Sequence, residues 1–221
     1  MSKPVIFCDF DGTVTNNDNI IAIMKKFNPP GWESVKDDIL AQRVSIKDGV
    51  AKMFTLLPSS KKDDIISYVL EQAQIRDGFS EFVAYAKKQD IALYIVSGGI
   101  DFFVYPLLES FGPFAGVYCN EADFSGETIN INFPHRCDDE CTSQGCGCCK
   151  PSIIRELLEN GAKSIVIGDS ITDLEAAKRA DLVIARDFLI EKCEELGLSY
   201  EPFENFRDVT SIIDARLGVK L

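Results

Sequence analysis

The sequence lacks any apolar stretch that approaches the roughly 20 residues needed for a membrane-spanning helix. It also has no hydrophobic signal segment before its first predicted strand, so we expect a cytoplasmic location. Basic residues are in short supply: 23 lysines and arginines face 35 aspartates and glutamates, which gives a formal net charge of −12. Such a negative field repels phosphate polymers and anionic bilayers, so we expect no nucleic-acid and no membrane partner. A small phosphate ester can still bind where the site itself is cationic.

The chain does contain enough apolar residues for a substantial core. Its 221 residues are 46% apolar and 26% charged, which is ordinary for a soluble globular protein. This length suits one domain with an insertion, or two small domains.

An apolar strand that ends in acids opens the chain. Residues 5–8 are apolar and partly β-branched, and Asp9 and Asp11 follow at the carboxyl end of this predicted strand. Side chains two apart on an extended chain point the same way, so the two carboxylates would crowd one small space. A divalent cation would relieve their repulsion. Taken alone, the segment reads equally well as a strand followed by an acidic turn.

A second predicted strand, residues 91–96, leads into Ser97, Gly98 and Gly99. A hydroxyl followed by two amides without side chains can approach a phosphate oxygen closely. This segment therefore predicts a phosphate contact at the end of a strand.

Two further segments supply a cation and more acids. Lys150 precedes Pro151, which suits the first turn of a helix, so an ammonium lies beside a helix N-terminus and both attract anions. Residues 164–167 predict a strand that ends at Asp169, with Asp173 shortly after it. Taken alone, Lys150 reads as a solvated lysine and Asp173 as a charge that faces a helix dipole.

The order of these segments predicts the fold class. Strands alternate with helices over most of the chain, which indicates an α/β fold with a parallel, doubly wound sheet whose site lies at the carboxyl ends of the strands. Residues 14–76 differ, because they show helical periodicities and no comparable strand. We therefore expect a core of residues 1–13 and 77–221 with a helical segment, residues 14–76, inserted into it. A β-hairpin is predicted beside the site over residues 123–133.

The complete ordered set of motifs is more specific than any one of them. Asp9-Phe10-Asp11-Gly12-Thr13, Ser97 before two glycines, Lys150, and Gly168-Asp169 with Asp173 resemble the four motifs of the haloacid dehalogenase superfamily of phosphatases. The resemblance runs from residue 5 to about residue 185. It implies a Rossmann-like core with a helical cap inserted after the first motif, as in the phosphoserine-phosphatase-like branch. An acid at Asp11 is typical of the phosphatase and mutase branches.

The resemblance implies a Mg²⁺-dependent phosphomonoesterase that acts through an aspartyl-phosphate. Asp9 is then the nucleophile and Asp11 the general acid and base. Mg²⁺ is the expected cofactor, because it is a hard ion that prefers carboxylates, water and phosphate. The implied metal ligands are Asp9, the backbone carbonyl of Asp11, and Asp169, with Asp173 as a nearby orienting acid. The implied phosphate-binding residues are Ser97, Gly98, Lys150, Gly12 and Thr13.

Two residues of the inserted segment bear on the substrate. In phosphoserine phosphatases an acidic cap residue binds the ammonium of serine and a cap arginine binds its carboxylate. Asp18 falls near the acidic position, and Met53 falls at the arginine position in an ungapped comparison. A methionine replaces a carboxylate clamp with an apolar contact, which favours an uncharged, thioether-bearing leaving group. The plainer interpretation is that Met53 belongs to the core of the cap, and phosphoserine, phosphoethanolamine and phosphocholine are the alternative substrates.

Five of the eight cysteines lie just before Lys150: Cys137, Cys141, Cys146, Cys148 and Cys149. With His135, the only histidine, they can ligate a structural Zn²⁺ through four thiolates or through three thiolates and the imidazole. Reduced thiols and disulfides are the alternatives, and a reducing cytoplasm disfavours disulfides. The segment resembles the cysteine-rich approach to the lysine motif in phosphoethanolamine and phosphocholine phosphatases.

A protein of another class fits part of the same pattern. A catalytically silent domain of this fold would use the cysteine segment to bind a metal or a partner protein. Such a domain need not retain Asp9, Asp11, Lys150 and Asp169 together, so the intact set favours an enzyme.

Overall fold

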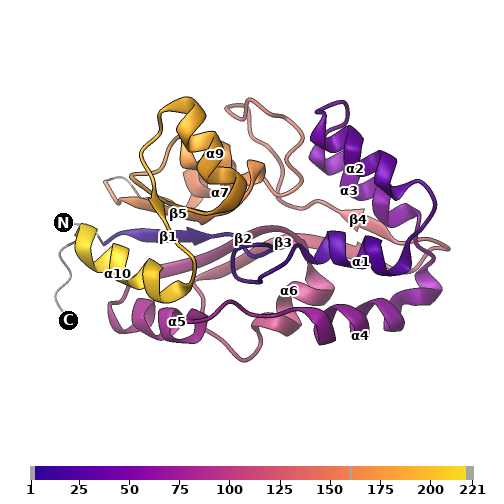
Figure 1. Ribbon diagram of the computed structural model, residues 1–221, viewed down its shortest axis with the longest axis horizontal. Coiled ribbons are helices and arrows are strands. Elements are labelled where there is room, and N and C mark those ends of the chain that lie inside the picture. The colour runs from indigo at the N-terminus through magenta and orange to yellow at the C-terminus, as the bar shows by residue number, and fades with distance from the viewer. Residues whose placement is uncertain (1–2, 160, 218–221) are drawn as a thin grey trace.

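The computed structural model (Figure 1) describes residues 3–159 and 161–217, which form a sheet, helices on both of its faces and a helical segment at one end. Within the described residues the sheet has seven strands in the order β4-β3-β2-β1-β5-β6-β7. The strands are β1 (Val5–Cys8), β2 (Ala92–Ile100), β3 (Gly116–Asp123), β4 (Asn130–Asn132), β5 (Ser164–Gly168), β6 (Leu182–Ala185) and β7 (Glu201–Pro202). All neighbouring strands pair in parallel except β3 and β4, which pair antiparallel.

Helices cover both faces of the sheet, so the predicted doubly wound α/β class is confirmed. In Figure 1, α5, α6 and α10 lie below the sheet and α7 and α9 lie above it. The core helices are α5 (Phe79–Lys88), α6 (Asp101–Leu108), α7 (Lys150–Leu157), α8 (Leu174–Ala177), α9 (Asp187–Leu196) and α10 (Phe206–Leu217), with a 3₁₀ turn at Ile171–Asp173.

The strand order places β1 and β5 side by side in the middle of the sheet. From β1 the chain adds β2 and then β3 on one side, and it then crosses back to place β5 on the other side. In open α/β sheets the crevice at such a reversal, outside the carboxyl ends of the strands, is where ligands bind. The residues that follow β1 and β5 therefore lie at the predicted position of the site.

The helical segment, residues 14–76, contains four α-helices and lies at one end of the sheet, on the right in Figure 1. They are α1 (Asn19–Phe27), α2 (Trp32–Leu40), α3 (Ile46–Thr55) and α4 (Lys62–Gln72), with a 3₁₀ turn at Ser59–Lys61. Local signals explain the boundaries. Asp18 and Ser45 accept hydrogen bonds from backbone N–H groups in the first turns of α1 and α3, and Asn28 ends α1 in the left-handed conformation. Trp32, the only tryptophan, is buried in α2, and its indole N–H donates to Asn28 Oδ1 at 3.0 Å.

The chain enters and leaves the helical segment through two stretches of backbone, residues 14–16 and 74–76, that pair with each other. Thr15 and Ile75 form an antiparallel bridge. The N–H of Arg76 donates to Val14 O at 2.7 Å, and the N–H of Asn16 donates to Gln74 O at 2.9 Å. The helical segment is thus joined to the core by a paired connection.

A buried arginine ties this connection to the loop that follows β1. Arg76 is only 7% exposed, and its guanidinium donates to the carbonyl oxygens of Gly12, Thr13 and Thr15 at 2.8, 2.7 and 3.1 Å. Buried carbonyl groups need donors, and Arg76 supplies three of them from one side chain.

The structure extends two strands beyond their predicted bounds. β2 continues through Ser97, Gly98 and Gly99 to Ile100, with a shift in its register against β3 after Val96. β3 extends to Asp123, because its second half pairs with β4 in the predicted hairpin. A helix begins at Lys150 as predicted and ends at Leu157.

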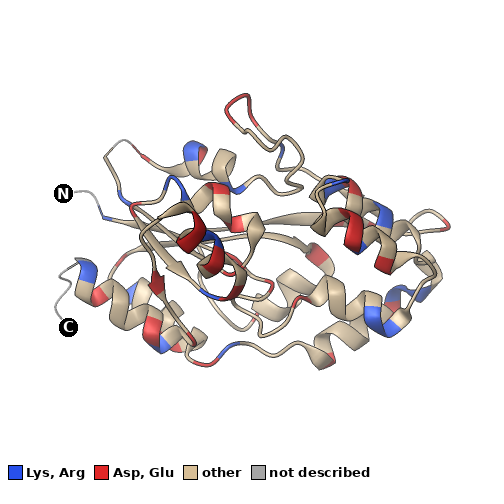
Figure 2. Ribbon diagram, turned by 45° about the horizontal axis from the view of Figure 1, so that its top comes forward, with Lys and Arg blue, Asp and Glu red and all other residues tan. Residues whose placement is uncertain are grey.

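Acidic residues occur on both parts of the molecule. Figure 2 shows them on the core helices, on the helical segment and in the loops between, so the excess of negative charge is not confined to one end. No helix among the described residues is long and apolar enough to cross a membrane.

Substituting Arg76 with methionine tests the role of the buried guanidinium. We expect the Arg76→Met variant to lose about 2–4 kcal/mol of unfolding free energy, because three buried carbonyls lose their donor. Urea denaturation followed by circular dichroism measures the loss. Arg207→Met is the matched control: Arg207 is exposed and pairs with Asp77, and an exposed pair of this kind contributes little to stability because solvent screens it. Equal losses in the two variants would contradict the assignment.

Candidate active site

Asp9 and Lys150 form the centre of the site. Asp9 is the first residue after β1, and Lys150 begins α7. Both side chains are buried, and Lys150 Nζ lies 2.9 Å from Asp9 Oδ1 and contacts Asp173 Oδ1. The backbone N–H of Phe10 also donates to Asp9 Oδ1, at 2.7 Å. One ammonium therefore lies between two buried carboxylates, and Lys150 is not a solvated lysine.

Asp169 reaches the same place from the end of β5. The hydroxyl of Thr13 donates to Asp169 Oδ1 at 2.8 Å, which joins the first motif to the last. Gly12 permits this approach: a Cβ atom there would lie 2.3 Å from Asp169 Oδ2, and Gly12 has a positive φ of 78°. A side chain at Gly12 would collide with the carboxylate and strain the backbone.

Asp173 is buried and bonded on both of its oxygens. Oδ2 accepts from the backbone N–H groups of Asp169 and Ser170, each at 3.1 Å, and Oδ1 contacts Lys150. Asp173 therefore holds both the turn that carries Asp169 and the ammonium of Lys150. The alternative interpretation, that Asp173 only places a charge at a helix dipole, does not account for these contacts.

Asp11 is oriented by a residue of the helical segment. The backbone N–H and the side-chain Nδ2 of Asn19 both donate to Asp11 Oδ1, at 3.0 and 2.6 Å. Asp11 Oδ2 is buried and has no hydrogen-bond partner among the described residues. It lies against β2, since a Cβ on Gly99 would be 2.4 Å away from it. One oxygen of Asp11 is thus fixed and the other is left available.

Ser97 and Gly98 lie in β2, beside β1. Ser97 is fully buried, and its Oγ accepts from the N–H of Gly99 at 2.9 Å, so its own proton remains available to a ligand. The Nδ2 of Asn120, on β3, donates to Gly98 O at 2.8 Å and fixes this part of the strand.

Sequence reasoning missed three residues that hold the site: Asn19, Arg76 and Asn120. Asn19 had a usable signal, because it is a polar residue at the start of an otherwise apolar helix face. Nothing local marks Arg76 or Asn120, whose partners lie in distant parts of the sequence.

Burial and mutual repulsion dominate the electrostatics of the acids. Burial, followed by the charge of Asp173, raises the pKa of Asp9 and raises that of Asp169 to about 7. Burial, followed by the charge of Asp18, raises the pKa of Asp11. The pKa of Lys150 is raised as well, because Asp173 and Asp9 outweigh the opposing effect of its burial. The protein alone thus supplies too little positive charge for its carboxylates.

This arrangement fits a hard divalent cation. Carboxylate oxygens of Asp9, Asp169 and Asp173 lie within 4.8 Å of one another. Carboxylates are the ligands that Mg²⁺ prefers, and a dication would offset the repulsion that raises their pKa values.

The two predicted substrate residues differ in their surroundings. Asp18 is exposed, caps α1 and is close enough to Asp11 to raise its pKa. Met53 is buried in α3 and belongs to the main apolar core, which agrees with the plainer of its two interpretations. Its contact with a substrate stays a prediction.

Four of the five clustered cysteines come together. The Sγ atoms of Cys137, Cys141, Cys146 and Cys149 lie within 4.8 Å of one another. Cys148 lies outside this group: its thiol points to Tyr118 O at 3.9 Å and packs in a separate apolar cluster. His135 is not part of the group, and its ring packs edge-on against Tyr118. All eight cysteines are free thiols in the structure.

Comparison with known proteins identifies the family. The sequence model of the haloacid dehalogenase-like hydrolases matches residues 6–178. The chain belongs to this family. The match covers the first motif, Ser97, Lys150, Asp169 and Asp173, so the resemblance inferred from the motifs is confirmed.

Similar haloacid dehalogenase-like proteins include several bacterial enzymes named 2-hydroxy-3-keto-5-methylthiopentenyl-1-phosphate phosphatase. The chain is 62% identical to the protein of this name from Geobacillus kaustophilus (strain HTA426), over 93% of each chain. It is 55% identical to that of Bacillus cereus (strain B4264), over 97% of this chain and 98% of the relative.

Solved structures support the same fold. A substrate-bound phosphoserine phosphatase complex superposes with a TM-score of 0.73 at 19% identity, over 96% of this chain and 99% of that chain. A phospho-aspartyl intermediate analogue of phosphoserine phosphatase gives a TM-score of 0.69 at 19% identity, over the same shares. The chain therefore has the fold of these phosphatases.

The raised pKa of Asp169 predicts how the metal-free protein responds to pH. A carboxyl whose pKa is raised on folding keeps its proton in the folded state after the unfolded state has lost it, so stability falls as the pH rises through that interval. We expect the melting temperature of EDTA-treated protein to fall by at least about 2 °C between about pH 5 and pH 7.5. In a chain of this size, a loss of about 1 kcal/mol of unfolding free energy lowers the melting temperature by about 2–4 °C. Thermal denaturation measures it.

Asp169→Asn and Mg²⁺ serve as the two controls. The Asp169→Asn variant should lose less stability over the same interval, because the titrating group is gone. Mg²⁺ should stabilise the wild-type protein more at the higher pH, where the carboxylates are ionised. A melting temperature that rises with pH without metal would contradict the description of the site.

Proposed function

We propose that this chain is a Mg²⁺-dependent phosphatase that hydrolyses 2-hydroxy-3-keto-5-methylthiopentenyl-1-phosphate, in methionine salvage, through an aspartyl-phosphate on Asp9. The observation that carries the chemistry is the buried Asp9 carboxylate, held between Lys150 and the strand end, with a second carboxyl two residues away. The substrate rests on the relatives of that name, which are 52–62% identical over more than nine-tenths of this chain.

The first step transfers the phosphoryl group to the protein. A carboxylate oxygen of Asp9 attacks phosphorus, and the bond from phosphorus to the leaving oxygen breaks. Lys150 favours the ionised form of Asp9 and faces the phosphate, whose other oxygens the hydroxyl of Ser97 and the N–H group of Gly98 contact. The N–H groups of Gly12 and Thr13, which were expected to contact the phosphate too, already donate within the loop, to Asn17 O at 3.3 Å and to Phe10 O at 3.2 Å.

Asp11 handles the proton in both steps. Burial, followed by the charge of Asp18, raises the pKa of Asp11 and so favours the protonated form, which can donate to the leaving oxygen. Because Asn19 occupies Oδ1, the proton lies on Oδ2, the oxygen left without a partner. In the second step the Asp11 carboxylate takes a proton from water, which attacks phosphorus, and phosphate leaves Asp9.

The proposed ligands of the metal are Asp9, the backbone carbonyl of Asp11, and Asp169. Asp173 already binds Lys150 and the turn before it, so its role is to orient Asp169. Bound Mg²⁺ supplies positive charge that lets the crowded carboxylates ionise and offsets the charge of the phosphoryl group.

Residues 14–76 act as the cap in this proposal. They carry Asn19, which orients Asp11, and Asp18 and Met53, the candidate substrate contacts. A cytoplasmic location belongs to the proposal as well: all eight cysteines are free, and thiols persist in a reducing compartment.

Removal of the nucleophile tests the enzymatic assignment. We expect Asp9→Asn to lower kcat for p-nitrophenyl phosphate by at least about 10³-fold, because the amide cannot form the intermediate. EDTA should abolish wild-type turnover, and Mg²⁺ should restore it. Turnover that survives the substitution, or a wild-type protein that shows none, would favour the silent-domain alternative.

Removal of the proton carrier separates the two steps. We expect Asp11→Asn to lower the steady-state rate by about 10²–10⁴-fold. p-Nitrophenolate leaves without help from an acid, so stopped-flow absorbance should show a burst of about one nitrophenolate per enzyme before the slow phase. A slowed reaction without a burst would contradict the second role of Asp11.

A panel of phosphate esters tests the substrate. We expect the methylthio enol phosphate to exceed phosphoserine, phosphoethanolamine and phosphocholine in kcat/KM by at least about tenfold, or 1.4 kcal/mol. Phosphoserine as the best substrate would overturn the interpretation of Met53 while leaving the phosphatase chemistry intact.

A further inference from the structure

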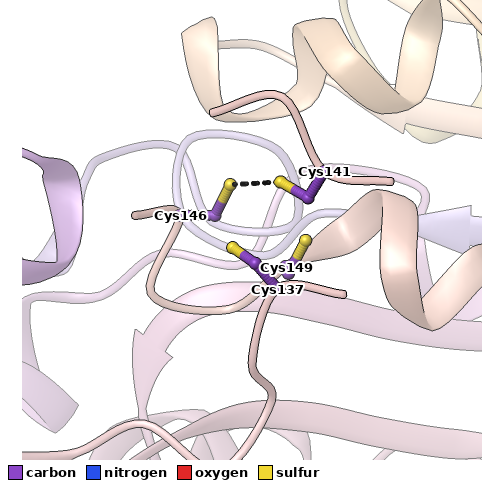
Figure 3. Close-up of side chains that lie close together, drawn as sticks. All are labelled: Cys137, Cys141, Cys146 and Cys149. Carbon is purple, nitrogen blue, oxygen red and sulfur yellow. Dashed lines mark hydrogen bonds between the residues drawn. The ribbon is translucent and has the colours of Figure 1, made fainter. Parts of the chain in front are cut away.

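The segment that leads into α7 brings four thiols to one point. Figure 3 shows the sulfur atoms of Cys137, Cys141, Cys146 and Cys149 turned toward one another. Every pair of these atoms lies within 4.8 Å, and Cys141 Sγ is 3.7 Å from Cys146 Sγ. A disulfide requires about 2.05 Å, whereas four thiolates about 2.3 Å from a central zinc are about 3.8 Å apart.

We propose that Cys137, Cys141, Cys146 and Cys149 bind one structural Zn²⁺ in a tetrahedral site of four thiolates. All four positions of the metal are filled by the protein, so the site is closed and takes no part in the phosphatase chemistry. Zinc suits this donor set because thiolates are soft ligands and zinc readily adopts tetrahedral coordination.

The backbone around the thiols is already arranged as a compact turn. The carbonyl oxygens of Asp138 and Cys141 both accept from Gln144 Nε2, at 3.0 and 2.7 Å. The N–H of Cys149 donates to His135 O at 3.1 Å, which brings the start and the end of the segment together. The segment from residue 133 to 149 contains no helix or strand, so few backbone hydrogen bonds stabilise it. A structural metal supplies folding free energy to such a segment.

The surroundings also provide positive charge for an anionic centre. Zinc with four thiolates carries a net charge of −2. Cys149 is the residue before α7, where the helix dipole favours a negative charge. Arg155, further along α7, pairs through its Nε with Asp138 Oδ2 at 2.8 Å and so holds the residue that follows Cys137, and its buried Nη1 has no hydrogen-bond partner among the described residues.

The position of the proposed zinc explains what it would stabilise. Cys149 directly precedes Lys150, the cation of the active site. On its other side the same turn touches the helical segment, since the N–H of Lys47 in α3 donates to Gly145 O at 3.0 Å. In Figure 1 this turn is drawn in salmon, near α2 and α3. A zinc there would fix both the approach to Lys150 and a contact with the helical segment.

Metal analysis of the full-length protein tests the proposal. We expect protein purified under reducing conditions without chelator to contain about one zinc per chain by mass spectrometry, as a closed site of this donor set predicts. A mercurial that binds thiols should release that zinc. These readouts do not depend on turnover, so a failed zinc site and a failed phosphatase assignment are distinguishable.

Variants identify the ligands. We expect the double variant Cys141→Ser, Cys146→Ser to lose at least about nine-tenths of the zinc, because removing two ligands should weaken zinc binding by at least about tenfold. Cys148→Ala is the matched control, because Cys148 belongs to the same segment but points elsewhere, and it should keep one zinc. Should the double variant fail to fold, cobalt added to apoprotein should give the visible absorption of a tetrahedral cobalt-thiolate site.

The proposal is overturned if the wild-type protein holds no zinc and takes up none when reduced, or if it holds iron in place of zinc. A mass decrease that corresponds to disulfides among the four cysteines would also overturn it, and so would an unchanged zinc content in the double variant.

Discussion

Repulsion among buried and half-buried carboxylates is the constraint around which the site is built. Asp9, Asp169 and Asp173 gather at the ends of two neighbouring parallel strands, and Lys150 is the ammonium in contact with this group. The cost of that crowding appears as raised pKa values for Asp9 and Asp169. The excess of negative charge destabilises the empty site. The same excess favours the binding of a dication together with a phosphate.

Backbone contacts hold these charges in position as much as the ion pairs do. Gly12 allows the first motif to approach Asp169, Asn19 fixes Asp11 from the helical segment, and Arg76 secures the carbonyl groups of the loop between them. The acids therefore sit on a loop that is tied from three directions. A loop of this kind can carry mutually repelling groups without rearranging to separate them.

The fold and the central acids were predictable because their signals are local. A short apolar run ending in acids predicts a strand and its polar tip, so Asp9, Asp11 and Asp169 could be located by pattern and spacing. Arg76 and Asn120 could not, because their partners are backbone groups that are distant in sequence. The cysteine spacing indicated a cluster, but which thiols converge depends on the path of an irregular turn, and Cys148 faces the core instead.

The position of Trp32 has a practical consequence. The only indole of the protein is buried in α2, within the helical segment. Tryptophan emission is therefore an intrinsic reporter of that segment, without any label. Circular dichroism follows the helices and strands of the whole chain, so the two signals recorded together reveal whether insertion and core lose their structure in one transition or in two.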